Sequence, residues 1–264
     1  MELNVRSLVI EATRKCNMNC EHCLRGNSQR KTADNNHIYK LFQLISNVSD
    51  LTITGGEPTL AMDTLEYIEQ AIRYGYCDVS SFYIVTNGKS INVERLAKWA
   101  YDMRDVCYDN EMSSVNFSFD DFHLHTFNNK QLEKQRRNCY KLQEILDEEY
   151  GIYEEENFVS KHSNSDWGYS SLLKEGRAKD FGSRDNNVQF FEEYETETSI
   201  DFSETELYLT CSGYLIAGCN WSYHSMDSRK DIQIAHIDDI RCQDDLIEAI
   251  KTYNKKHQEV LECV

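Results

Sequence analysis

Three cysteines lie close together near the start of the chain, at Cys16, Cys20 and Cys23, in a C-x3-C-x2-C spacing. Thiolates are soft ligands, which favour iron–sulfur clusters and zinc over hard cations. Three thiolates on one loop would hold three irons of a four-iron cluster and leave the fourth iron open to an external ligand. A zinc knot is the alternative. It needs a fourth ligand, and His22 is poorly placed to supply one because it adjoins Cys23.

A second motif, Gly-Gly-Glu-Pro at residues 55–58, follows the next strand-like segment and contains Pro58, the only proline of the chain. Two glycines would let a ligand approach the backbone closely. Glu57 offers a carboxylate to an ammonium group. The pair of motifs is more specific than either motif alone.

Together, the cysteine spacing and the Gly-Gly-Glu-Pro motif resemble the radical S-adenosylmethionine (SAM) enzymes over residues 5–125. The resemblance implies one 4Fe-4S cluster held by Cys16, Cys20 and Cys23, with the open iron chelated by the amino and carboxylate groups of SAM. His22 would take the usually aromatic position before the third cysteine. The methionine part of SAM would be lined by Gly55, Gly56, Glu57 and Pro58.

Further cofactor contacts are implied at four positions by the same resemblance. Ser118 and Asp120 follow the fourth strand-like segment and would contact the SAM ribose or carboxylate, although a helix-capping turn explains them equally well. Asn87, in a Thr-Asn-Gly triplet, would lie near the cofactor, or form an ordinary turn. Arg177, in a Gly-Arg-Ala segment, would pair with the SAM carboxylate through its guanidinium, or lie on the surface.

Weaker candidates for acting on the substrate are Asp121, His123 and His125. In an extended segment the two histidines would share a face, because Leu124 separates them. They could bind substrate or relay a proton near neutral pH. A solvated loop is the competing interpretation.

The elements that must position these residues alternate between strand and helix patterns. Strands are predicted at residues 7–11, 51–54, 82–86 and 114–119, and helices at residues 33–47, 62–74, 93–103 and 130–150. Such alternation predicts an α/β fold with a parallel sheet, whose chemistry lies at the carboxyl ends of the strands. The resemblance to radical SAM enzymes implies that this sheet is a partial (β/α)6 TIM-like barrel.

The pattern weakens after residue 150. An acidic stretch at residues 192–206 is predicted to be a solvated loop, although it could attract a basic peptide. A hairpin at residues 207–217 and a closing helix at residues 244–257 follow. We therefore predict a barrel core at 1–205 and a small C-terminal extension of hairpin and helix at 206–264, packed on the barrel.

The other cysteines divide into two groups. Those beyond residue 200 contain no C-x2-C pair, so a single cluster is expected; they are Cys211, Cys219, Cys242 and Cys263. Three others lie in or beside helix patterns and are predicted to be buried small hydrophobic residues; they are Cys77, Cys107 and Cys139.

Composition excludes some partners. Acidic residues outnumber basic ones by 45 to 28 in 264 residues, a formal charge of −17. Such a balance argues against nucleic-acid binding, which rests on clustered Lys and Arg. The sequence lacks a signal peptide and an apolar stretch long enough to span a bilayer. We expect a cytoplasmic protein without a membrane partner.

The resemblance implies an enzyme that cleaves SAM reductively to methionine and a 5′-deoxyadenosyl radical, which abstracts hydrogen from a small molecule or peptide. An external electron donor such as flavodoxin or ferredoxin would reduce the cluster. One alternative is an activase that installs a glycyl radical on a partner protein. Another is a non-catalytic iron–sulfur redox sensor, which would have no need of a SAM site. The sequence does not identify the substrate.

Overall fold

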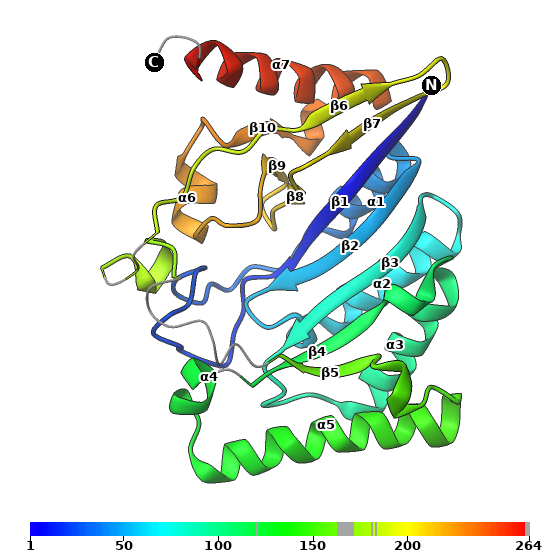
Figure 1. The fold of residues 1–264 in the computed structure, drawn as a ribbon, viewed down its shortest axis with the longest axis vertical. Coiled ribbons are helices and arrows are strands. Elements are labelled where there is room, and N and C mark those ends of the chain that lie inside the picture. The colour runs from blue at the N-terminus through cyan, green and yellow to red at the C-terminus, as the bar shows by residue number, and fades with distance from the viewer. Residues whose placement is uncertain (120, 163–171, 181, 183, 262–264) are drawn as a thin grey trace.

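The computed structural model describes residues 1–119, 121–162, 172–180, 182 and 184–261. Its centre is a twisted sheet in which five parallel strands lie side by side in chain order (Figure 1). These strands are β1 (Glu2–Thr13), β2 (Asn47–Gly55), β3 (Asp78–Thr86), β4 (Ser114–Ser118) and β5 (Val159–His162).

Helices connect consecutive strands and return the chain to the opposite end of the sheet. Helices α1, α2 and α3 lie behind the sheet in Figure 1, and the long helix α5 runs along its lower edge. Their bounds are α1 (Asn35–Leu44), α2 (Met62–Arg73), α3 (Val93–Val106) and α5 (Asn129–Tyr150), with the short α4 (Asp121–Thr126) before α5. The carboxyl ends of β1 to β5 therefore share one side of the molecule.

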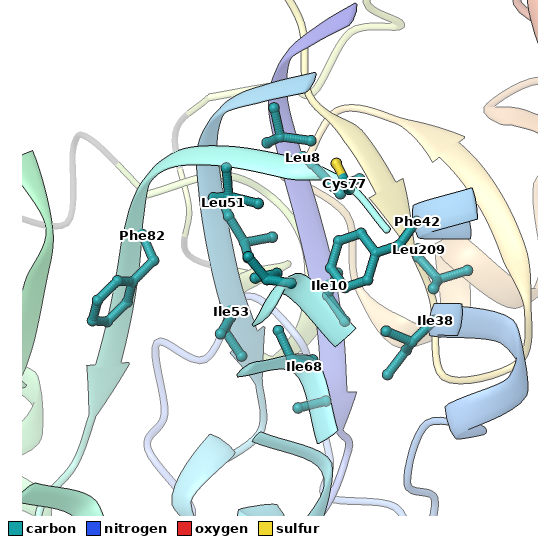
Figure 2. Close-up of a cluster of buried hydrophobic side chains, with 14 of the residues drawn as sticks. Leu8, Ile10, Ile38, Phe42, Leu51, Ile53, Ile68, Cys77, Phe82 and Leu209 are labelled. Carbon is teal, nitrogen blue, oxygen red and sulfur yellow. The ribbon is translucent and has the colours of Figure 1, made fainter. Parts of the chain in front are cut away.

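Periodicity and capping explain α1. Ile38, Leu41 and Phe42 recur at helical spacing and are all fully buried against the sheet. Asp34 begins the helix by accepting a hydrogen bond from the backbone N–H of Asn36. Figure 2 shows the resulting core, in which side chains of α1, α2 and the first three strands pack together with Leu209.

On the other side of β1 the sheet continues through β8 (Leu207–Leu209), which pairs parallel with β1. Strands β9 (Tyr214–Ala217) and β10 (Gln233–His236) then add antiparallel neighbours, and α6 (Tyr223–Ser228) lies between them in the chain. The expected α/β class with a parallel sheet is confirmed, and the sheet is not closed. The boundary at residue 205 stays a prediction.

The prediction of a solvated loop at residues 192–206 is wrong for most of that stretch. Strands β6 (Glu192–Glu195) and β7 (Ser199–Ser203) form an antiparallel hairpin there, and β7 pairs with the start of β1. Ile200 and Phe202 alternate with polar residues and are fully buried, which anchors β7. The exposed acids of β6 pair with Lys251, which lies on α7 (Gln243–Leu261). None of the described helices is long and apolar enough to cross a membrane.

Candidate active site

The cysteine loop, residues 14–32, leaves the carboxyl end of β1 and folds back on itself before α1 begins (Figure 1). The backbone N–H of Cys16 donates to Ser28 Oγ at 2.8 Å, and that of Cys23 donates to the carbonyl oxygen of Cys20 at 3.2 Å. Cys20 is buried, Cys16 and Cys23 are half-buried, and all three thiols are outside disulfides. The loop therefore offers three unoxidised thiols.

The surroundings of these thiols differ. Burial tends to raise the pKa of Cys20, but hydrogen bonds from His123 and Thr126 and the charges of His123 and Arg177 outweigh it, so the pKa of this thiol is lowered. Burial raises the pKa of Cys16 to about 11, and the nearby acidic Glu57 adds to the increase. Cys20 is thus more ready than Cys16 to bind a metal as a thiolate.

A cavity of about 400 Å³ opens at the carboxyl ends of the strands and contains the two motifs together. Its walls come from the cysteine loop, the ends of β2, β3 and β4, α4, and segments near residues 172–177 and 220. The lining residues that the sequence singled out are Cys16, Cys20, His22, Cys23, Gly55, Gly56, Glu57, Pro58, Asn87, Ser118, His123 and Arg177.

Gly55 and Gly56 are required by the packing of β2 against the start of the cysteine loop. A Cβ atom on Gly55 would lie 2.2 Å from the carbonyl oxygen of Thr13, and one on Gly56 would lie 2.4 Å from that of Lys15. The backbone N–H of Gly56 also donates to the carbonyl oxygen of Thr13 at 2.7 Å, and the backbone N–H of Glu57 donates to the carbonyl oxygen of Lys15 at 2.8 Å. The glycines therefore admit a neighbouring backbone, in addition to lining the cavity.

Replacing Gly56 with alanine is expected to reduce the iron bound after anaerobic reconstitution. The new Cβ would push the Lys15 carbonyl away and displace Cys16, the next residue. Iron assay per chain measures the effect. Gly75→Ala is the control: its φ of +73° also strains the backbone, but its Cβ would meet nothing within 4 Å and it lies outside the cavity lining, so this variant should bind iron like the wild type. Equal iron in both variants would contradict this packing role.

Glu57 is only 2% exposed, and its carboxylate is surrounded by donors of the protein. It accepts hydrogen bonds from the hydroxyls of Thr59 and Thr86, at 2.5 and 2.6 Å, and from the backbone N–H groups of Thr59 and Asn87, at 3.2 and 2.7 Å. Burial raises the pKa of Glu57, although these hydrogen bonds oppose the increase. With about four acceptor positions already used, the carboxylate joins β2 to β3 and has little capacity left for an ammonium group.

Asn87, directly after β3, connects that strand to the cysteine loop. Its side-chain amide donates to Asn17 Oδ1 at 2.9 Å, and its Oδ1 accepts from the N–H of Lys89 at 2.9 Å. The Lys89 ammonium donates in turn to the carbonyl oxygen of Asn17. The sequence suggested that Asn87 lies either near the cofactor or in an ordinary turn. It lies in a turn and also lines the cavity.

Ser118, at the end of β4, is buried and lines the cavity. Its backbone carbonyl accepts a hydrogen bond from Gln135 Nε2 at 2.7 Å, and the same amide donates to the carbonyl of Asn87 at 2.9 Å. Gln135, on α5, thus holds the ends of β3 and β4 together. The other half of the predicted pair, Asp120, lies outside the described residues.

Residues 121–126 form helix α4, so they are neither the extended segment in which the two histidines would share a face nor the loop of the competing interpretation. Two positions apart on a helix point in different directions, so His123 and His125 do not share a face. His123 lines the cavity and meets His22 edge-on at 4.9 Å between ring centroids, whereas His125 is exposed. The side chain of Asp121 lies outside the described residues.

Arg177 lies in a short 3-10 turn, Gly176–Ala178, that packs on the cysteine loop. Its guanidinium donates to the carbonyl oxygen of Cys20 at 2.6 Å and to Asn19 Oδ1 at 2.7 Å, and its backbone N–H donates to Cys23. At Gly176 (φ +57°) a Cβ would lie 2.2 Å from the carbonyl oxygen of Leu24. The segment therefore clamps the cysteine loop, and Arg177 reaches the cavity from there.

Several cavity residues carried no signal in the sequence. Asn220 and the pair Leu172 and Leu173 come from segments without a recognisable motif. Others are neighbours of the motifs that the spacing did not single out; they are Met18, Leu24, Thr54 and Val85. The apolar members give the cavity walls that would exclude water from a bound cofactor.

The remaining cysteines that the structure describes lie outside the cavity lining. Cys77, Cys107 and Cys139 are buried in the core, as predicted. Cys211 Sγ donates to the backbone carbonyl of Glu11 at 3.1 Å. Cys242 is exposed, and Cys263 lies outside the described residues. The expectation of a single cluster stays a prediction.

Comparison with known proteins gives both sequence relatives and a shared fold. No family model matches the chain. A probable GTP 3′,8-cyclase of Methanopyrus kandleri is 36% identical over 121 residues, which are 44% of this chain and 34% of that protein. Another, from Methanothermobacter thermautotrophicus, is 35% identical over 88 residues, 32% of this chain and 28% of that protein. The chain thus spans about a third of the length of the curated relatives it matches.

One solved structure, native anSMEcpe with bound AdoMet and Cp18Cys peptide, shares the fold with a TM-score of 0.52 and 13% identity. The alignment covers 97% of this chain and 83% of that one. AdoMet is the same molecule as SAM. This structure shares the fold, and the cysteine spacing, the Gly-Gly-Glu-Pro motif and the sequence relatives together support the assignment of the chain to the radical SAM family.

Proposed function

We propose that the chain is an enzyme that binds one 4Fe-4S cluster and SAM in the cavity at the strand ends and uses them to abstract hydrogen from a substrate. The observation that carries the proposal is the presence of three unoxidised thiols and the Gly-Gly-Glu-Pro segment in the walls of one cavity. Three thiolates without a fourth suit a cluster with one open iron. When bound, the cluster and SAM supply a 5′-deoxyadenosyl radical as the hydrogen acceptor.

The chain's own residues would bind, orient and shield these groups. Cys16, Cys20 and Cys23 would ligate the cluster, and Arg177 would hold the loop between them through the Cys20 carbonyl. Asn87 and Glu57 would fix the ends of β2 and β3 beside the cofactor. Apolar side chains of the cavity would keep water from the radical, as cofactor enzymes require.

The substrate would be a small molecule or a peptide. Support for a peptide comes from the Cp18Cys peptide bound to the solved protein that shares this fold. An external donor such as flavodoxin or ferredoxin would deliver the electron that SAM cleavage needs. The acidic composition argues against nucleic acid as a partner.

Formation of 5′-deoxyadenosine tests the proposed function. Wild-type protein with a reconstituted cluster, dithionite and SAM is expected to form 5′-deoxyadenosine and methionine, detected by liquid chromatography and mass spectrometry. The same chain without iron should form neither product. A protein that binds a redox-active cluster but leaves SAM intact would be a redox sensor, and the enzymatic proposal would then be wrong.

A further inference from the structure

Two histidines and one aspartate from distant parts of the chain meet outside the cavity lining. His37 lies in the first turn of α1, His236 ends β10, and Asp238 follows in a 3-10 turn at Ile237–Asp239. One ligand atom from each of the three lies within 4.8 Å of the other two. The proposed radical chemistry does not use this histidine–aspartate group.

The two distances from the histidines to Asp238 are close to those between ligands of one small cation. His37 Nε2 lies 3.5 Å from Asp238 Oδ1, and His236 Nδ1 lies 3.6 Å from Asp238 Oδ2. Two ligands of a tetrahedral zinc ion are about 3.4 Å apart when each bond is about 2.1 Å long. The ligand atoms of the two histidines lie within 4.8 Å of each other, so rotation of the side chains would bring all three to one ion.

Hydrogen bonding fixes the ligand nitrogen of His236. Its Nε2 lies 2.9 Å from the carbonyl oxygen of Ser212 and must donate, because a carbonyl only accepts. The proton is therefore on Nε2, and Nδ1 carries a lone pair toward Asp238. Metal-ligating histidines commonly donate their other N–H to a backbone carbonyl in this way. The backbone N–H of Asp238 approaches the same Nδ1 at 3.3 Å, a long contact that a cation would displace.

A glycine gives the two imidazoles room to converge. A Cβ on Gly213 would lie 2.7 Å from both His236 Nε2 and His37 Cε1, and its φ of +83° suits glycine. The Lys40 ammonium donates to the backbone carbonyl of Asp238 at 3.1 Å and not to its carboxylate, whose oxygens face the two histidines. The carboxylate side chain is 64% exposed, so an ion from solvent can reach it.

We propose that His37, His236 and Asp238 bind one divalent transition-metal ion of the zinc class, separately from the cysteine loop. Two imidazole nitrogens favour such ions over calcium and magnesium, which prefer oxygen. Three protein ligands leave a fourth position for water. The bound ion would connect α1 to the C-terminal turn, two segments 200 residues apart in the chain, and stabilise the folded protein.

Cobalt(II) titration of the full chain tests the proposal. The titration uses the full chain with Cys16, Cys20 and Cys23 replaced by alanine, so that these thiols do not compete for the ion and no iron–sulfur absorption masks the cobalt bands. This parent chain is expected to bind one cobalt with visible d–d bands and without a sulfur-to-cobalt charge-transfer band. Both His37→Ala and Asp238→Asn should weaken binding by about 10- to 100-fold or more. His224→Ala, at an exposed histidine elsewhere, should bind like the parent chain.

Zinc should compete for the bound cobalt and raise the melting temperature of this parent chain, but not that of its Asp238→Asn variant. The aspartate variant keeps the test valid if His37→Ala fails to fold, because the Asp238 side chain is largely exposed. Absence of cobalt binding, parent-chain affinity in Asp238→Asn, or a charge-transfer band from thiolate ligation would overturn the proposal. None of these outcomes bears on 5′-deoxyadenosine formation, so the two proposals fail separately.

Discussion

Substituting alanine for Cys16, Cys20 and Cys23 together is expected to abolish iron binding, whereas the wild type should bind about four irons per chain after anaerobic reconstitution. The three thiols line one cavity and lie on a loop held in place by Ser28 and Arg177. Without them, the described walls of the cavity retain no thiolate. Iron and sulfide assays with the absorption spectrum of the cluster measure the loss.

A matched triple variant controls for the removal of thiols in general. Cys77, Cys107 and Cys139 are equally numerous but lie in the core, so their replacement by alanine should leave iron content unchanged in the folded fraction. Iron retained by the Cys16, Cys20 and Cys23 variant would show that other residues hold the cluster. Zinc alone in anaerobically purified wild type would favour the zinc-knot alternative.

Replacing Glu57 with alanine is expected to lower the free energy of unfolding by on the order of 3 kcal/mol, because buried donors on Thr59, Thr86 and Asn87 lose their acceptor. The loss should separate the ends of β2 and β3 and weaken SAM binding as a consequence. Denaturation in urea, followed by circular dichroism on the anaerobic apo-protein, measures the stability.

Two milder changes separate these effects. Thr86→Ser keeps the hydroxyl that donates to Glu57 and should unfold near the wild-type midpoint, whereas Thr86→Val should lose about 1 kcal/mol. If Glu57→Ala has wild-type stability and weak SAM binding, the carboxylate acts on the ligand directly, as the sequence motif suggests. If Glu57→Ala has both the stability and the SAM affinity of the wild type, Glu57 neither holds the strand ends together nor binds SAM.

Local sequence patterns were sufficient to predict most of the helices and strands in the first half of the chain. Ile38, Leu41 and Phe42 predict the buried face of α1, and the β-branched residues before Gly55 predict β2, because helical and strand periodicities depend on near neighbours. The two motifs were placed correctly at the ends of adjacent strands, since parallel strands bring their carboxyl ends together. The cavity that contains both follows from that arrangement.

Most features that could not be predicted from the sequence depend on contacts between residues far apart in the chain. Strand β7 is recognisable only by its pairing with β1, because two apolar residues among acids give a weak signal. Leu172, Leu173 and Asn220 reach the cavity through tertiary structure alone. The partners of Glu57 at Thr86 and Asn87 lie about thirty residues away, so its burial and hydrogen bonds could not be inferred from the motif. The helix at α4 is too short for periodicity to reveal.

Electron paramagnetic resonance of the reduced cluster during titration with SAM tests most directly whether this cavity unites an open iron with SAM. SAM is expected to change the spectrum, and the change should saturate at about one SAM per cluster, because chelation perturbs the open iron. Adenosine lacks the methionine part of SAM that would chelate the iron, so adding it at the same concentration should leave the spectrum unchanged. If saturating SAM leaves the spectrum of the cluster unchanged, SAM does not bind the open iron in this cavity and the proposed function is wrong.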